Sequence, residues 1–229
     1  VMNTERAPFD NPKVRKAVRM AVDRQELVDT VMGGEAVVSC DTPVAPTDQY
    51  RHDMSCEQNI SMAKNLLREA GYPNGIEMVI HVSTKEPTWP TIAEVIQQQV
   101  AKAGIKVEIK MTPSKSYWKE TWMKKDVAMT RWNERSADSV LHEVYHSSAK
   151  WNESYYKSSD FDKNLADARG ELDFNKRKAL YEKAQHTLWE QSGTMIPYHV
   201  SKLVVTNSRV KNLDEVEVFS VQWHKVKVD

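Results

Sequence analysis

A run of aromatic and charged side chains in the middle of the sequence has the composition of a ligand-binding surface. A cleft that holds a small molecule needs apolar or aromatic walls and a few charged groups that fix the orientation of the ligand. The residues that we select on this basis as candidate ligand-binding residues are Tyr117, Trp118, Trp122, Trp132, Glu134, Arg135, Asp138 and Trp151. The alternative interpretation is structural, since Trp118 and Trp122 are four positions apart and would form the buried face of a helix.

His142, Glu143 and His146 spell H-E-x-x-H, which offers a competing enzymatic hypothesis. On a helix this spacing places both imidazoles on one face, where they can bind zinc, and the glutamate becomes a general base. The position six residues beyond His146 is Asn152 rather than a third histidine, and the only distant acidic candidate is Glu171. We therefore expect no catalytic residue, metal or cofactor, and keep a zinc metallopeptidase as the alternative function.

The charge balance narrows the class of partner. The 229 residues include 32 Lys and Arg against 32 Asp and Glu, so the formal net charge is +0. Such a chain lacks the long-range positive field that attracts nucleic acid or an anionic membrane, and we expect neither partner. No apolar run approaches the roughly 20 residues that cross a bilayer, and no signal-peptide pattern follows Val1, which predicts a mature or truncated polypeptide.

The two cysteines, Cys40 and Cys56, lie in a loop-like segment rich in Asp, Pro and Thr. A disulfide between them would stabilise the fold by about 3 kcal/mol in the chain-entropy model, and it would fit an oxidising compartment. Two free thiols are the alternative.

Two helix–glycine–strand units in tandem predict an α/β fold. An apolar helical stripe ends at Gly71 before period-two alternation from Ile76 to Val82, and a second stripe ends at Gly104 before alternation from Ile105 to Met111. Repeated units of this kind favour a sheet with helices packed on it.

The remaining elements are predicted from capping residues and periodicity. Pro12 marks a first helical position, and Asp23 with Glu26 resembles a capping box. The other predicted segments are helices over 12–22, 23–32, 117–124, 139–146, 159–172 and 173–191, a strand over 127–132, and a strand-like segment from about 195 to 229.

An ordered series of short motifs resembles the bacterial extracellular solute-binding proteins of family 5, which serve peptide, opine and nickel ABC transporters. In chain order the motifs are PFDN, VRKA, DRQELVD, LLREAGYPNG, IQQQVAKAGIKVEI, FD at 161–162, KRKALYEKAQ and IPYHVS. Each motif alone is short, whereas the series covers nearly the whole chain in a fixed order.

The resemblance implies a fold and a domain arrangement. It predicts a lobe of the periplasmic-binding-protein-like II type, α/β in class, with a mixed sheet and helices packed on it. Residues 1–195 would form a C-terminal ligand-binding lobe, and residues 196–229 a strand-like tail that in relatives returns to an N-terminal lobe outside this chain.

The resemblance also implies a function. It predicts the substrate-binding component of an ABC importer, which binds a small polar ligand such as a peptide or opine by closure of two lobes. The partners would be that ligand and a membrane permease, the location periplasmic or extracytoplasmic in a bacterium, and the full-length protein a monomer.

One position departs from the pattern of the peptide-binding relatives. They carry an aspartate, which holds the ammonium group of the ligand, three positions after the tryptophan that ends the central strand, whereas Arg135 follows Trp132 here. A guanidinium binds a carboxylate or phosphate instead, so the ligand would present an anion to this lobe. Two alternatives stay open: Glu134 or Asp138 serves an ammonium after a register shift, or Arg135 is a surface residue paired with Asp138.

Overall fold

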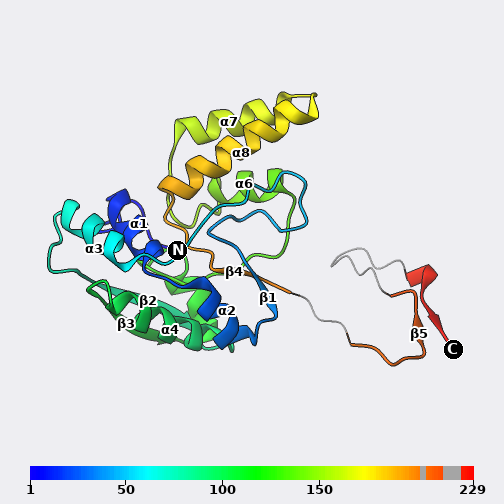
Figure 1. Cartoon of the computed structure of the whole chain (residues 1–229), viewed down its shortest axis with the longest axis horizontal. Helices are drawn as coiled ribbons and strands as arrows, with labels where there is room; N and C mark the ends of the chain where they lie inside the picture. The colour runs from blue at the N-terminus through cyan, green and yellow to red at the C-terminus, as the bar shows by residue number, and fades with distance from the viewer. Residues whose placement is uncertain (202–204, 214–222) are drawn as a thin grey trace. The chain divides into compact units, whose positions relative to one another are not determined.

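The computed structural model describes residues 1–201, 205–213 and 223–229. The chain divides into two units, Val1–His199 and Val200–Asp229, which are described separately (Figure 1). No helix in the described ranges is long and apolar enough to span a membrane.

The first unit begins with two helices whose starts follow the predicted caps. Helix α1 (Pro12–Met20) begins after Asn11, whose side chain accepts a hydrogen bond from the Lys13 N–H. Helix α2 (Arg24–Met32) begins after Asp23, whose side chain accepts from the Glu26 N–H. The predicted capping box is completed differently, because Gln99 and not Glu26 accepts the hydrogen bond from the Asp23 N–H, at 3.0 Å.

The tandem helix–glycine–strand prediction is confirmed. Helix α3 (Ile60–Glu69) precedes strand β2 (Ile76–Ser83), and helix α4 (Trp89–Ala101) precedes strand β3 (Ile105–Thr112). The two strands are parallel and pair in register from Ile76 with Ile105 to Ser83 with Thr112. Helices α1 to α4 lie around this pair in Figure 1, and the buried side chains of these elements form the larger of two cores.

Gly75 and Gly104 lie at the starts of β2 and β3 and permit a close approach of their main chains. Both have positive φ, +87° and +84°. A Cβ added at Gly75 would lie 1.8 Å from the carbonyl oxygen of Gly104, so the packing of these two turns requires glycine at position 75.

A second core belongs to helices α6 (Ala137–Tyr145), α7 (Ser159–Gly170) and α8 (Phe174–Gln191). The N-caps of these helices are Ser136, Ser158 and Asp173, each accepting from a main-chain N–H of the first turn. The three helices gather in one half of the first unit in Figure 1, away from the β2–β3 pair.

Two arginines of α1, which belongs to the larger core, bond to the carboxyl end of α8, which belongs to the second core. Arg15 donates hydrogen bonds to the carbonyls of Gln191 and Ser192, and Arg19 donates to those of Trp189 and Glu190. The last carbonyls of a helix have no partner within it and carry partial negative charge, so they suit cations. Burial lowers the pKa of Arg15 to about 10 and also lowers that of Arg19.

The termini of the first unit meet. Strand β1 (Ala36–Val38) pairs with β4 (Tyr198–Val200), and the N–H of Met2 donates to the carbonyl of Gly193 at 2.7 Å. In the second unit, β5 (Val210–Lys211) pairs antiparallel with β6 (Lys227–Val228), and a 3₁₀ turn covers Trp223–Lys225. Parts of the predicted strand-like tail, residues 202–204 and 214–222, lie outside the described residues.

Two predicted elements take other forms. Residues 117–124, predicted as a helix, contain a π-helical turn η1 (Tyr117–Thr121), which follows a short helix α5 (Ser114–Ser116). Residues 127–132, predicted as a strand, make only isolated bridges, from Val127 to Met2 and from Ala128 to His81. Beyond Met129 the next side chains bond to other parts of the chain, Thr130 and Trp132 to Glu153 and Arg131 to Glu86.

Candidate ligand-binding surface

The buried carboxylate of Glu153 organises the predicted aromatic surface. Its side chain accepts hydrogen bonds from the indole N–H of Trp122, from the hydroxyl of Thr130 at 2.7 Å, and from the indole N–H of Trp132 at 3.1 Å. Glu153 is 8% exposed. Three residues from two segments that are separate in sequence are therefore held at one carboxylate.

A tight turn places Glu153. The preceding Asn152, itself buried, donates from its side-chain amide to the carbonyl of Tyr156 and accepts from the Tyr156 N–H at 3.1 Å. The carbonyl of Ser154 accepts from both the main-chain N–H and the hydroxyl of Thr4. Asn152 thus bonds nearby main chain, as asparagine commonly does in a turn.

The structure brings together four of the predicted aromatic residues as two neighbouring pairs. The ring centroids of Trp132 and Trp151 are 5.7 Å apart, and those of Trp118 and Trp122 are 5.6 Å apart. The pairs are linked through the shared contact of Trp122 and Trp132 with Glu153. Trp118 is 40% exposed and Trp151 37%, so this tryptophan surface is open to a ligand.

Tyr117 is not part of the exposed surface. It is fully buried, its hydroxyl donates to the carbonyl of Met129, and burial raises the pKa of that hydroxyl. Its ring packs edge-on against Trp89 and Trp118. The aromatic side chain that was predicted as a wall is instead a buried support beneath Trp118.

The alternative pairing of Arg135 with Asp138 is not formed. Arg135 forms an ion pair with Glu143 at 2.8 Å rather than with Asp138, and its guanidinium lies 5.4 Å from the ring centroid of Trp132. Asp138 is bound instead by two nitrogens of the Arg169 guanidinium. Asp138 lies in the first turn of α6, next to the last turn of α7, which carries Arg169, and it is therefore bound by Arg169 rather than by Arg135.

Glu134 stands apart from these ion pairs. It is exposed and accepts a hydrogen bond from the hydroxyl of Thr47 at 3.0 Å. Of the charged candidates, only Arg135 lies over the ring of a tryptophan of the surface.

The H-E-x-x-H motif does not form a metal-binding set. His142 lies on α6 and His146 is the residue that follows its last turn, with ring centroids 4.9 Å apart, but Glu143 is held by Arg135 and by the hydroxyl of Ser139. Burial and the nearby Arg169 lower the pKa of His142. Within residues 1–201, 205–213 and 223–229 no group of three or more His, Cys, Asp or Glu is placed to hold a metal ion. The geometry therefore does not support a zinc metallopeptidase.

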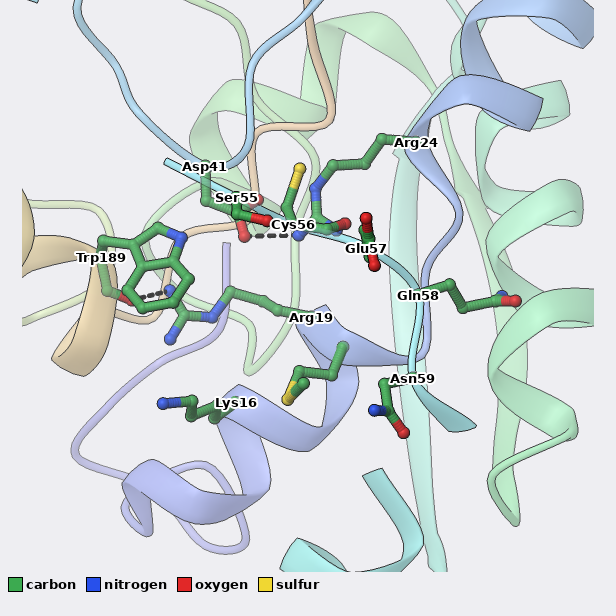
Figure 2. A pocket seen from close by; sticks show the side chains of 11 residues that line it. Lys16, Arg19, Arg24, Asp41, Ser55, Cys56, Glu57, Gln58, Asn59 and Trp189 are labelled. Atoms are coloured by element: carbon green, nitrogen blue, oxygen red, sulfur yellow. Dashed lines mark hydrogen bonds and ion pairs between the residues drawn. The ribbon is translucent and has the colours of Figure 1, made fainter. Parts of the chain in front are cut away.

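A separate pocket of about 240 Å³ lies beside α1, and Figure 2 shows that Arg19 extends toward Trp189 at this pocket and Arg24 toward Asp41 and Cys56. The cationic side chains that line it have partners within the protein. Lys16 forms an ion pair with Glu190 and Arg24 with Asp41, while Arg19 donates hydrogen bonds to carbonyls at the end of α8. None of the predicted ligand-binding residues lines this pocket.

Cys40 and Cys56 form a disulfide beside this pocket, with their Cα atoms 5.2 Å apart. The bond closes the loop that contains Asp41. Arg24 reaches into the loop and donates to the carbonyl of Cys56 at 3.3 Å as well as to Asp41. The disulfide and the ion pair therefore fix the same segment.

Sequence reasoning missed the residue at the centre of the surface. Glu153 lies in a polar tetrapeptide, and a glutamate in such a segment is ordinarily solvent-exposed, so nothing local to it predicts burial. The available signal was the number of tryptophans, seven among 229 residues, since buried indole N–H groups require acceptors.

Comparison with known proteins gives a consistent result. A family model described as bacterial extracellular solute-binding proteins, family 5 Middle, matches residues 1–152. The glutathione-binding protein GsiB of Escherichia coli (strain K12) is 32% identical over 222 residues, covering 91% of this chain and 43% of that protein.

Solved structures show the same similarity. The periplasmic binding protein DppA from Helicobacter pylori, in complex with the peptide STSA, has a TM-score of 0.79 and 28% identity, over 99% of this chain and 46% of that chain. HbpA2 from Haemophilus parasuis has a TM-score of 0.77 and 28% identity, over 87% and 41% of the respective chains. The chain thus spans less than half the length of these relatives, and the predicted α/β fold of the periplasmic-binding-protein type is confirmed.

Proposed function

The chain belongs to the bacterial extracellular solute-binding proteins of family 5, and from this premise we propose that it is the C-terminal ligand-binding lobe of the substrate-binding component of an ABC importer. Its ligand would be a small polar molecule such as a peptide or opine. The proposal includes a membrane permease as partner, a periplasmic or extracytoplasmic location, a monomeric full-length protein and no catalytic role.

The observation that carries the proposal is the tryptophan surface. Trp118, Trp122, Trp132 and Trp151 lie together, two of them substantially exposed, with Arg135 beside Trp132. Exposed aromatic rings next to fixed charges supply both the apolar contact and the orientation that a small ligand needs. A surface of this kind on one lobe would form half of a binding cleft.

The mechanism follows from that arrangement. A ligand that contacts both lobes favours the closed state by the difference in its affinity for the closed and open arrangements. One lobe alone offers half of the contacts and still bears the entropy loss of association. We therefore expect this chain to fold but to bind its ligand weakly.

Calorimetry tests both parts of the proposal. The probes are glutathione and a short unmodified peptide, titrated into this chain and into a longer protein that includes a second lobe like that of its relatives. We expect tight binding of at least one probe only in the longer protein, lost on Trp151→Ala and retained on Phe174→Ala, a change at an exposed ring of α8. Sub-micromolar binding by this chain alone would contradict the two-lobe mechanism, and equal losses in both variants would contradict the assigned surface.

A further inference from the structure

Glu153 differs from the other acidic residues around the tryptophan surface, because it is buried without a cationic side chain. Glu143 is paired with Arg135 and Asp138 with Arg169, whereas Glu153 forms no ion pair with a side chain of the described residues. All three of its side-chain hydrogen bonds come from neutral donors. Burial of a carboxylate costs free energy unless hydrogen bonds compensate, so these three bonds are required to keep it in place.

The donors show what the carboxylate does. One is Trp122, at the end of the π-helical turn η1, and the others are Thr130 and Trp132, in the segment that leaves the bridge with β2. Neither segment has a regular ladder or a full helix to fix its side chains. The carboxylate supplies a common point to which both indole groups are bound by charged hydrogen bonds, which are shorter and stronger than neutral ones.

We propose that Glu153 is the positioning residue of the ligand surface, holding Trp122 and Trp132 so that their ring faces and not their N–H groups meet the ligand. This inference rests on the function proposed above for that surface. It also specifies the kind of contact: both indole donors are used internally, so these partly buried rings can offer a ligand ring atoms but no free N–H group.

A preference for ligand groups follows from that orientation. Faces of indole rings favour apolar, planar or cationic groups, and they offer no hydrogen bond to a carbonyl or carboxylate. The guanidinium of Arg135 over the ring of Trp132 is an example of this contact within the protein. Any acceptor group of the ligand must then be bound by residues other than these two tryptophans.

Indole N–H resonances in an NMR spectrum test the positioning directly. Seven tryptophans give seven indole signals, and Trp122→Phe and Trp132→Phe identify two of them. In Glu153→Gln, which keeps the size of the side chain but removes its charge, we expect these two signals to shift most. The matched control is Glu69→Gln, the same change at an exposed glutamate of α3 that is paired with Lys13. The inference is wrong if neither signal moves in Glu153→Gln, or if both move equally in Glu69→Gln.

Binding of glutathione to the longer protein separates a positioning role from a purely structural one. We expect Glu153→Gln to raise the Kd roughly tenfold, about the effect of one charged hydrogen bond, while the exposed control Glu69→Gln leaves it unchanged. Shifted indole signals with an unchanged Kd would overturn the positioning role. If the unsubstituted longer protein binds neither glutathione nor a peptide, the proposed function fails, whereas the NMR result still decides the indole contacts.

A second variant covers the case in which Glu153→Gln does not fold. Glu153→Asp keeps the charge but shortens the side chain, so it cannot reach both indole groups at once. We expect a folded protein in which at least one of the two indole signals moves and the Kd rises. If both signals and the Kd stay unchanged in Glu153→Asp, the inference is overturned.

Discussion

The buried ion pair of Arg24 and Asp41 leads to a quantitative prediction about stability. Both side chains are 3% exposed, and the second carboxylate oxygen of Asp41 accepts from the Ile196 N–H at 2.9 Å. Asp41→Asn keeps the size of the side chain but leaves the Arg24 cation buried without a carboxylate. Removing one partner of a buried pair typically costs about 3–5 kcal/mol of unfolding free energy. For a domain of this size that corresponds to a fall in Tm of roughly 6–20 °C.

Urea denaturation followed by circular dichroism measures this cost. The matched control is Glu69→Gln, which breaks the exposed pair with Lys13, 2.7 Å long with side chains 49% and 55% exposed. An exposed pair contributes at most about 1 kcal/mol, so the two variants should differ several-fold. If Asp41→Asn is no more destabilising than Glu69→Gln, the reasoning from burial is wrong.

A double-mutant cycle isolates the interaction between the two groups. Arg24→Met combined with Asp41→Leu removes both charges. The double variant should then lose less unfolding free energy than the sum of the losses in the two single variants. Additive effects would mean that each residue acts through its main-chain contacts alone, such as the bonds from Arg24 to the carbonyls of Val22 and Cys56.

Three other properties can be predicted from the structure. Replacing Cys40 and Cys56 by serine should lower the unfolding free energy by about 3 kcal/mol, and a reducing agent should destabilise the unsubstituted protein but not the variant, as measured by urea denaturation. Burial and the nearby guanidinium of Arg51 lower the pKa of His199 from its usual 6.5 to about 4. Between pH 6.5 and 4 the unfolded chain therefore binds more protons than the folded chain does. The unfolding free energy should fall by up to about 3 kcal/mol as the pH drops through this range. Much of this pH dependence should disappear in His199→Gln, and an unchanged profile would show that other groups cause it. Gly75→Ala should lower the Tm far more than Gly71→Ala. Both glycines have a similar positive φ, +87° and +91°, but only a Cβ at position 75 would meet a main-chain oxygen, at 1.8 Å. Equal falls in Tm would contradict this reasoning.

Local signals predicted most of the helices and both strands of the parallel pair. The caps at Asp23 and Asp173 and the glycines before β2 and β3 act within a few residues, so they are readable from sequence. The same is not true of residues 117–132. Their side chains have the periodicity of a helix and a strand, but the π-helical turn and the isolated bridges are determined by contacts with distant residues, including Met2 and His81.

The candidate surface was predictable in part. Aromatic and charged composition identified the tryptophans that the structure places together, because ligand surfaces and buried cores both concentrate such residues. Composition could not distinguish a ligand surface from a buried core, and Tyr117 proved to be buried. The alternative partner considered for Arg135, Asp138, was wrong for a similar reason, since the pairing with Glu143 depends on where α6 lies relative to the preceding segment. Glu153 could not be found at all without the fold, because its donors come from residues 122, 130 and 132.

The meeting of the first and last segments of the first unit has a kinetic consequence. Met2 bonds Gly193, β1 pairs with β4, and Arg15 and Arg19 require the completed end of α8. Contacts between residues so distant along the chain form slowly, since a long loop must close before any of them contributes. During folding, the guanidinium groups of Arg15 and Arg19 therefore lack their carbonyl acceptors until the end of α8 is in place, whereas the apolar side of α1 can already pack against α3 and β2.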